Sequence, residues 1–96
     1  MTTVETIRFH LRDSVTDEDF QALNQRVETE YMAKRPGFRT RETLRSEDGE
    51  WLVIVHWASE ADAKATIDAF FGAPETQAFI AAVDKTTVAS GRYLPA

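Results

Sequence analysis

The sequence contains no cysteine, no long apolar run and no basic leader. Without cysteine the chain cannot form a disulfide framework, a thiolate nucleophile or a Cys-ligated zinc or iron–sulfur site. No apolar stretch approaches the ~20 residues that a membrane span needs. The start of the chain, MTTVETIRFH, lacks the charged region and apolar run of a signal peptide. We therefore expect a soluble cytoplasmic protein that has no membrane partner.

Basic side chains are also in the minority. The 96 residues carry 16 acidic and 11 basic side chains, which gives a formal net charge of −5. Because phosphate backbones and anionic lipids attract cationic surfaces, this balance argues against nucleic acid and membranes as partners. A chain of this length forms one domain, residues 1–96, and buries only about 60 to 65% of the surface of its unfolded chain. Association into a homodimer is one way to bury more.

The first half of the chain reads as a strand followed by a helix. Residues 4–12 alternate between apolar and polar side chains, which predicts a strand. Thr16 precedes three acidic residues and is expected to cap a helix, since carboxylates are favourable at the positive end of the helix dipole. The apolar stripe of that helix is Phe20, Leu23, Val27 and Tyr31. Pro36 and Gly37 are expected to stop it.

A β-hairpin is predicted around Asp48 and Gly49. This pair readily takes the positive φ angles of a two-residue type I′ turn, which would place Glu47 opposite Glu50. Side chains alternate across a strand, so this register assigns each residue to a face. One face is then expected to hold Leu44, Trp51, Val53, Val55 and Trp57, and the other Leu52, Ile54 and His56.

The remaining elements complete a recognisable order. Ser59 with Asp62 forms a variant of the capping box and opens a second helix, which Gly72 is expected to end. Pro74 suits the start of a further short helix, and residues 87–94 form the last strand. The order β-α-β-β-α-β is the ferredoxin-like arrangement, an α+β fold. It predicts a four-stranded antiparallel sheet of spatial order 4-1-3-2 with both main helices on one face.

The two faces of this sheet are expected to differ in chemistry. The helix-side set is uniformly apolar: Ile7, Phe9, Leu11, Leu52 and Ile54. The opposite set mixes apolar and polar groups: Thr6, Arg8, His10, Leu44, Trp51, Val53, Val55 and Trp57. Such a patch is unusually large for the surface of a monomer, so it predicts a subunit interface or a ligand-lined cavity.

The motifs resemble one known group of proteins. The helix-ending Pro36-Gly37-Phe38, the hairpin and the Trp57-Ala58-Ser59 step are similar to the antibiotic-biosynthesis monooxygenase family of the dimeric α/β-barrel superfamily. The resemblance covers nearly the whole chain and implies a barrel made from the sheets of two subunits, with a cleft between sheet and helices in each. Cofactor-free members oxidise electron-rich polyketide phenols with O₂, so the resemblance implies no cofactor.

Haem chemistry is disfavoured by comparison with other members of that superfamily. In haem-degrading relatives, a Trp similar to Trp57 lies on the distal side of the haem and a His on the second helix binds the iron. Residues 59–84 contain no histidine. Two histidines alone do not make a metal site, because no carboxylate is spaced to join both as a ligand. We expect no bound metal.

His10 and Arg92 are the candidate catalytic residues. Imidazole titrates near neutrality, so His10 can act as a base or substrate anchor, or it can make a structural hydrogen bond at the dimer interface. Arg92 can steady a phenolate, and Tyr93 can donate a proton, although adjacent strand residues point to opposite faces.

The other candidates are ligand-binding residues. Trp57 and Trp51 can form a pocket wall or pack in an interface, and Val55 and Arg8 belong to the same mixed face. Trp57 is expected to form the aromatic wall and to be packed on one side only. The cations Arg39, Arg41 and Arg45 recur at strand spacing. They either clasp an anion or protect an edge strand from further pairing.

These residues leave more than one function open. The first is a cofactor-independent, monooxygenase-like enzyme that acts on or binds a small aromatic or polyketide compound in a hydrophobic cleft. The second is a non-catalytic homodimer that binds a small hydrophobic ligand or serves as a structural module. The third is an isomerase of the muconolactone type on the same fold.

Overall fold

The structure is a computed structural model that describes residues 2–96. It contains both helix caps that the sequence predicts. The Thr16 hydroxyl accepts a hydrogen bond from the Asp19 amide at 3.1 Å and begins helix α1 (Asp17–Glu30). The Ser59 hydroxyl accepts one from the Asp62 amide at 3.2 Å and begins helix α2 (Glu60–Phe70). Both caps satisfy backbone donors that have no partner within the helix, and both predictions are confirmed.

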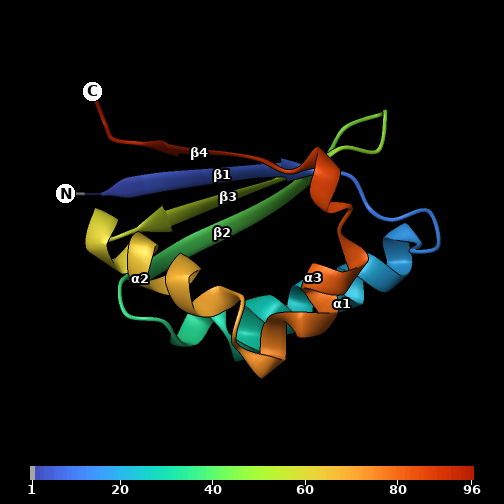
Figure 1. The fold of residues 1–96 in the computed structure, drawn as a ribbon. Coiled ribbons are helices and arrows are strands. Elements are labelled where there is room, and N and C mark those ends of the chain that lie inside the picture. The colour runs from blue at the N-terminus through green and yellow to red at the C-terminus, as the bar shows by residue number, and fades with distance from the viewer. Residues whose placement is uncertain (1) are drawn as a thin grey trace.

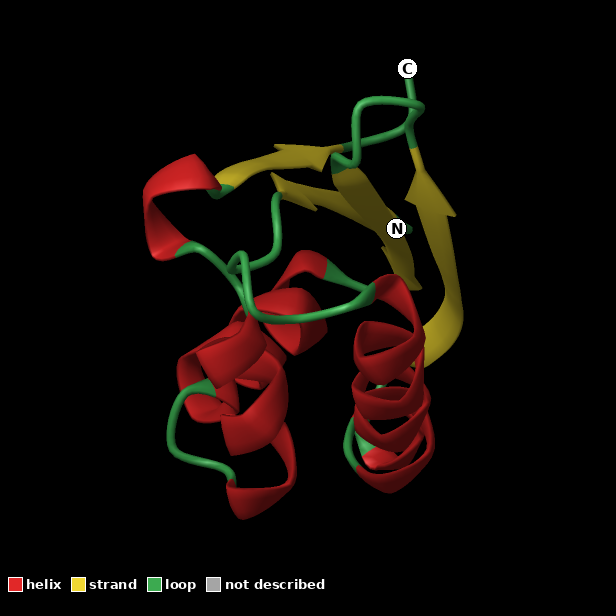
Figure 2. Cartoon of the chain, turned by 90° about the vertical axis from the view of Figure 1, so that its right-hand side faces the viewer, coloured by secondary structure: helices red, strands yellow, loops and turns green. Residues whose placement is uncertain are grey.

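The sheet has the predicted topology. Its four strands are β1 (Thr3–Phe9), β2 (Phe38–Arg45), β3 (Trp51–Trp57) and β4 (Ala89–Tyr93). They pair antiparallel in the order β2-β3-β1-β4, which is the expected 4-1-3-2 read from the other edge. The short elements are η1 (Met32–Lys34), η2 (Pro74–Thr76), α3 (Gln77–Ala82) and η3 (Lys85–Thr87). The helices α1, α2 and α3 all lie on one side of the sheet (Figure 1), and Figure 2 shows the other side open.

The segment between α1 and β2 differs from the expectation that Pro36 and Gly37 stop the helix. Helix α1 already ends at Glu30, and the chain continues as the 3₁₀ turn η1. Gly37, with φ of 79°, makes the turn into β2. A Cβ atom on Gly37 would overlap the Asp62 carboxylate at the start of α2, so this close approach requires glycine.

The predicted hairpin register is wrong by one residue. Arg45 pairs with Trp51, and the Ser46 amide donates to the Glu50 carbonyl at 2.8 Å, so residues 47–49 form a three-residue loop. Gly49 has φ of 87°, as expected for a loop that closes with a glycine in the left-handed region. A one-residue shift moves every side chain of one strand to the other face relative to its partner.

The face assignment of β3 is also reversed, as its pairing with β1 shows. The side chains that face the helices are Trp51, Val53, Val55 and Trp57, all buried, whereas Leu52, Ile54 and His56 face the open side. Phe9 and Phe20 are in the core as expected. The ring of Phe20 lies 5.6 Å from that of Phe9, 4.7 Å from that of Trp51 and 5.3 Å from that of Phe79. This aromatic cluster closes one end of the space between sheet and helices.

Candidate functional site

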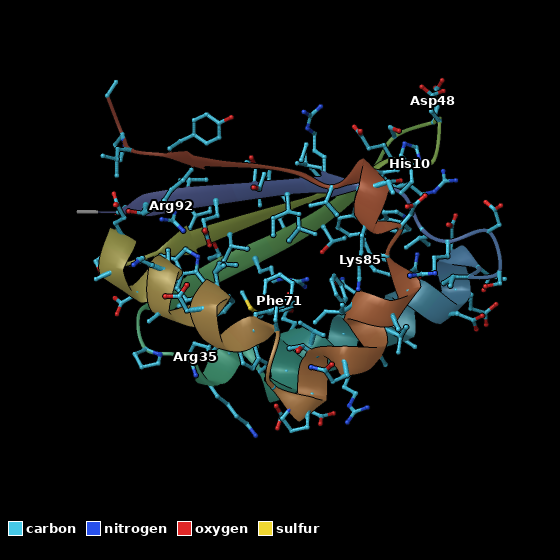
Figure 3. All side chains as sticks on the ribbon, in the orientation of Figure 1. His10, Arg35, Asp48, Phe71, Lys85 and Arg92 are labelled. Carbon is cyan, nitrogen blue, oxygen red and sulfur yellow. The ribbon has the colours of Figure 1, made fainter. Side chains whose placement is uncertain are left out.

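The sheet and the helices enclose a cavity of about 350 Å³. This volume lies within the range of small-molecule sites. Its lining residues are mostly apolar and come from all four strands and from the helices and turns that cover them: Glu5, Ile7, Phe9, Met32, Arg41, Val53, Val55, Ile67, Phe70, Phe71, Phe79, Ile80, Val83, Lys85, Val88 and Ser90. Figure 3 labels Phe71, just after α2, and Lys85 on η3, which both line this cavity.

Strand alternation supplies the floor of the cavity. Ile7 lies opposite Val53, and Glu5 lies opposite Val55, so these four residues point to the helix side together. Helix α2 contributes Ile67 and Phe70 to the opposite wall, and α3 contributes Phe79 and Ile80. The cavity is thus an apolar slot with a rigid sheet on one side.

One row of side chains across the sheet contains three charged residues. Arg41 on β2 pairs in register with Val55, Val55 with Glu5, and Glu5 with Arg92 on β4. The row therefore reads Arg-Val-Glu-Arg across the four strands. A charged row among apolar neighbours marks the part of the cavity that can make directional contacts with a ligand.

Glu5 is held from two directions. Its side chain is 9% exposed, and Arg92 donates to Oε2 from Nη2 at 2.9 Å and from Nε at 3.3 Å. The Trp57 indole N–H donates to Oε1 at 3.0 Å. A buried carboxylate needs such partners to offset its lost hydration. These bonds fix the position of the carboxyl group on the cavity wall.

Arg41 is less completely paired. Its side chain is 3% exposed, and Nη1 lies 3.6 Å from Glu28 Oε1, beyond normal hydrogen-bond length. Nη1 is buried and has no hydrogen-bond partner among the described residues. Burial lowers the pKa of Arg41 from its usual value, and the nearby Glu28 carboxylate opposes this shift. An arginine is nevertheless charged at neutral pH, so the wall carries a poorly compensated cation.

The mouth of the cavity combines a cation with exposed apolar groups. Lys85 lies on η3, just before β4. Phe71 is 67% exposed, and Val88 is 47% exposed. Exposed apolar side chains beside an apolar cavity extend the surface that a hydrophobic ligand can cover.

The predicted site residues fall into separate groups. Val55 lines the cavity, and Arg92 lines a neighbouring hollow of about 260 Å³ that shares Glu5 and Ile7 with it. Trp57 is 0% exposed and reaches the site only through Glu5. Trp51 is buried against Phe20. The expectation that Trp57 is packed on one side only is wrong.

The other three predicted residues lie away from the cavity. Arg8 and Tyr93 occupy register positions on the open face of the sheet, because Arg8 pairs with Leu52 and Val4 with Tyr93. His10 follows β1, where its amide donates to the Thr87 hydroxyl at 2.9 Å and its carbonyl accepts from the Asp84 amide. Figure 3 shows His10 and Arg92 at opposite ends of the sheet. The structure does not bring these two residues together.

Sequence reasoning missed Glu5 and Lys85. Glu5 carried a signal, because it is the one charged residue in phase with Ile7 and Phe9 on the helix side of β1. A charged group at a core-facing position is uncommon unless it is paired or functional. Lys85 carried no such signal, since it lies in a short 3₁₀ turn outside any periodic pattern.

Residues 2–96 contain no group of three or more His, Cys, Asp or Glu side chains arranged to hold a metal ion. None of the helices described here is long and apolar enough to cross a membrane.

Comparison with solved structures identifies the fold. SnoaB, a cofactor-independent oxygenase from Streptomyces nogalater, matches with a TM-score of 0.80 at 18% identity over 99% of this chain and 93% of its own. A proposed antibiotic biosynthesis monooxygenase from Chloroflexus aurantiacus J-10-fl matches with 0.66 at 13% identity, over 100% and 94%. A Dabb family protein with a ferredoxin-like fold from Mesorhizobium loti matches with 0.71 at 16% identity, over 99% and 97%.

These matches confirm the resemblance at the level of fold. No protein-family model matches the sequence, and no curated protein matches it significantly. The chain thus has the ferredoxin-like fold that these solved structures share. A fold by itself does not assign an activity, which has to be argued from the cavity.

Proposed function

We propose that the protein binds a small, electron-rich aromatic compound in the cavity and oxidises it with O₂ without a cofactor. The observation that carries this proposal is the apolar cavity of about 350 Å³ with a buried, oriented carboxylate, Glu5, on its wall. The fold shared with SnoaB, a cofactor-independent oxygenase, supports it. The apolar walls would hold the aromatic rings, and Glu5 would face their acidic C–H or O–H group.

The reaction can be written for an anthrone-type substrate. A base removes a proton from the activated methylene group, and the resulting carbanion transfers electrons to O₂ to form a peroxide. Protonation and loss of water then give the ketone, so that R₂CH₂ + O₂ yields R₂C=O + H₂O. In this proposal Glu5 is the proton acceptor, since each carboxylate oxygen has more than one acceptor site. In this proposal Arg92 acts on the reaction through Glu5, whose carboxylate it holds in place by a hydrogen bond.

Oxygen consumption with anthrone as the substrate tests this proposal. Glu5→Gln keeps the shape of the side chain and an acceptor for Trp57, but it removes the base. We expect its turnover to fall by about 10² or more, the usual contribution of a general base. Glu47→Gln, at an exposed position in the hairpin loop, is the matched control and should retain wild-type turnover. Equal turnover in both variants would contradict the role of Glu5.

A second candidate is a non-catalytic protein that binds the same class of compound. It is favoured by the fact that both oxygens of Glu5 already accept hydrogen bonds, from Trp57 and from Arg92. Anthrone bound to the wild-type protein without O₂ consumption would identify this function. Absence of anthrone binding would contradict both candidates.

We also propose that the open face of the sheet forms a homodimer. Leu44 and Tyr93 on this face are 44% and 58% exposed. Arg8 and Glu42 lie in adjacent rows of the same face, and neither takes part in an ion pair within residues 2–96. A two-fold axis would let Arg8 meet Glu42 of the partner subunit, which makes the face self-complementary.

Light scattering tests the dimer directly. The expected mass is twice the 10.9 kDa of one chain. Ile54→Arg places a charge near the centre of the open face and should give a monomer. Phe71→Arg changes an exposed apolar residue on the helix side and should leave the mass unchanged. A monomeric wild-type protein at micromolar concentration would contradict the proposal. His10 does not line the cavity, so the prediction that it is catalytic would require a second site.

A further inference from the structure

The charge of the cavity wall is opposite to that of the whole chain. The protein has a net charge of −5, yet the charged residues that line the cavity are one carboxylate, Glu5, and two cations, Arg41 and Lys85. Glu5 is already paired with Arg92. Lys85 takes part in no ion pair within residues 2–96. The cavity wall therefore carries an excess of positive charge, which an anionic group on a ligand would balance.

Arg41 is the buried member of this pair of cations. Its side chain is 3% exposed, its Nη1 donates no hydrogen bond, and its nearest carboxylate oxygen, on Glu28, is 3.6 Å away. Glu28 is 43% exposed and does not line the cavity. A buried charged donor without a hydrogen bond destabilises the fold, and an acceptor that entered the cavity would relieve this cost.

We propose that Arg41 binds the carboxylate group of an aromatic ligand held in the cavity. This inference rests on the proposed function, because it names the chemical class of the compound that the same cavity takes. The planar guanidinium matches a carboxylate in geometry and charge, and such charge-assisted bonds are stronger in an apolar, water-poor site. Lys85 at the mouth adds a second, more exposed attraction.

The strand register places Arg41, and with it the carboxylate of the ligand, two strands away from Glu5. Arg41 and Glu5 lie in the same row with Val55 between them. Two inter-strand spacings amount to about 9 to 10 Å. A carboxylate beside Arg41 therefore avoids the strongest repulsion from Glu5, while the rings lie over Val53 and Val55. The arrangement places the anionic end of the ligand near β2 and its reactive end near β1.

Calorimetric titration with 2-naphthoate and its neutral isostere, 2-naphthamide, tests the inference. Wild-type protein should bind 2-naphthoate at least about 10-fold more tightly, as expected for a hydrogen bond to a charged group. Arg41→Met should remove most of this preference, leaving only the weaker attraction of Lys85, and should retain binding of 2-naphthamide. Arg45→Met is the matched control, because Arg45 lies on the same strand and face but does not line the cavity. It should keep the preference.

A second variant keeps the test decisive if Arg41→Met does not fold. Glu28→Gln removes the carboxylate that competes for Arg41, and its side chain is 43% exposed, so the substitution leaves the core intact. It should strengthen binding of 2-naphthoate and leave binding of 2-naphthamide unchanged. Unchanged or weaker binding of 2-naphthoate by Glu28→Gln would overturn the role of Arg41.

The failures of the two proposals are distinguishable. Equal affinity of the wild-type protein for 2-naphthoate and 2-naphthamide would overturn the inference about Arg41 and leave the aromatic cavity in place. If neither compound binds, the proposed function fails together with the inference.

Discussion

Trp57 and Glu5 are joined by a hydrogen bond of 3.0 Å from the indole N–H to Oε1. Trp57 lies at the end of β3, one pair along from Glu5 on the neighbouring strand, so the contact is a diagonal pair on the helix-facing side. Trp57 is fully buried. The tryptophan therefore acts on the cavity indirectly, by orienting the carboxylate rather than by forming its wall.

Replacement of Trp57 should lower the free energy of unfolding, and by more when core packing is lost together with the hydrogen bond to Glu5. Trp57→Phe leaves Oε1 of Glu5 without its donor and should lower the free energy of unfolding by about 1 to 3 kcal/mol. Trp57→Ala also opens a cavity in the core and should cost about 3 to 5 kcal/mol. Guanidinium denaturation measures both.

Trp51→Phe is the control for the Trp57 variants. Trp51 is also buried, but its indole N–H has no hydrogen-bond partner among the described residues. Its replacement by Phe removes no hydrogen bond and should destabilise less than Trp57→Phe. Equal losses in the two variants would show that the bond to Glu5 contributes nothing beyond packing.

The conformation of the hairpin loop predicts that alanine substitutions at Gly49 and Gly72 have different effects on stability. Gly49→Ala should destabilise by about 1 to 2 kcal/mol, because Gly49 has φ of 87° and a Cβ atom is unfavourable there. Gly72→Ala should be neutral or stabilising, since its Cβ would meet nothing within 4 Å and its φ is not positive. Thermal unfolding of the two variants compares them. The opposite order would contradict the three-residue loop.

The same loop explains where sequence reasoning succeeded and where it failed. The caps at Thr16 and Ser59 and the strand order were predictable, because each rests on a local signal or on topology. The register was not, because Asp48-Gly49 fits both a two-residue and a three-residue loop. The sequence of β3, WLVIVHW, is apolar on both faces, so hydrophobic alternation could not decide between them.

The candidate site was predictable only in part for the same reason. The shift of one residue places Arg41 over the cavity beside Val55. Its burial, which distinguishes it from the exposed Arg39, depends on Glu28 of α1 lying against it. These are contacts between distant parts of the chain, which periodicity does not report. Glu5, by contrast, was detectable from the sequence, because it shares the helix-facing side of β1 with Ile7 and Phe9.

Stability should fall at alkaline pH through Tyr31. The Tyr31 hydroxyl donates to the Thr66 carbonyl at 2.7 Å, and burial raises its pKa, although nearby Arg35 opposes the shift. A native pKa above the unfolded value of about 10 means that the native state holds the proton more tightly. The free energy of unfolding is therefore unaffected by this group below pH 10 and declines as the pH rises through the native pKa.

Denaturation between pH 7 and pH 12 checks this dependence. Tyr31→Phe should lower stability at pH 7 by about 0.5 to 1.5 kcal/mol, the value of one hydrogen bond. It should also show a shallower alkaline decline than the wild-type protein. Tyr93→Phe, at an exposed position, should keep the full decline. A wild-type slope in Tyr31→Phe would contradict the assignment.

Hemin should bind only weakly. Residues 59–84, which include α2 and α3, contain no histidine that could ligate the iron from the helix side of the cavity. Titration followed in the Soret region should give a small change that does not saturate. A sharp stoichiometric shift that disappeared in His10→Ala or His56→Ala would contradict this expectation.

Methyl chemical-shift mapping tests most directly whether the cavity between the sheet and helices α2 and α3 is the ligand site. Alternate residues of β3 report on the two faces of the sheet, which makes one strand its own control. Addition of 2-naphthamide to methyl-labelled protein should shift Val53 and Val55 together with Ile67 of α2, and leave Leu52 and Ile54 unchanged. Shifts confined to Leu52 and Ile54 would place the ligand on the open face and contradict the account.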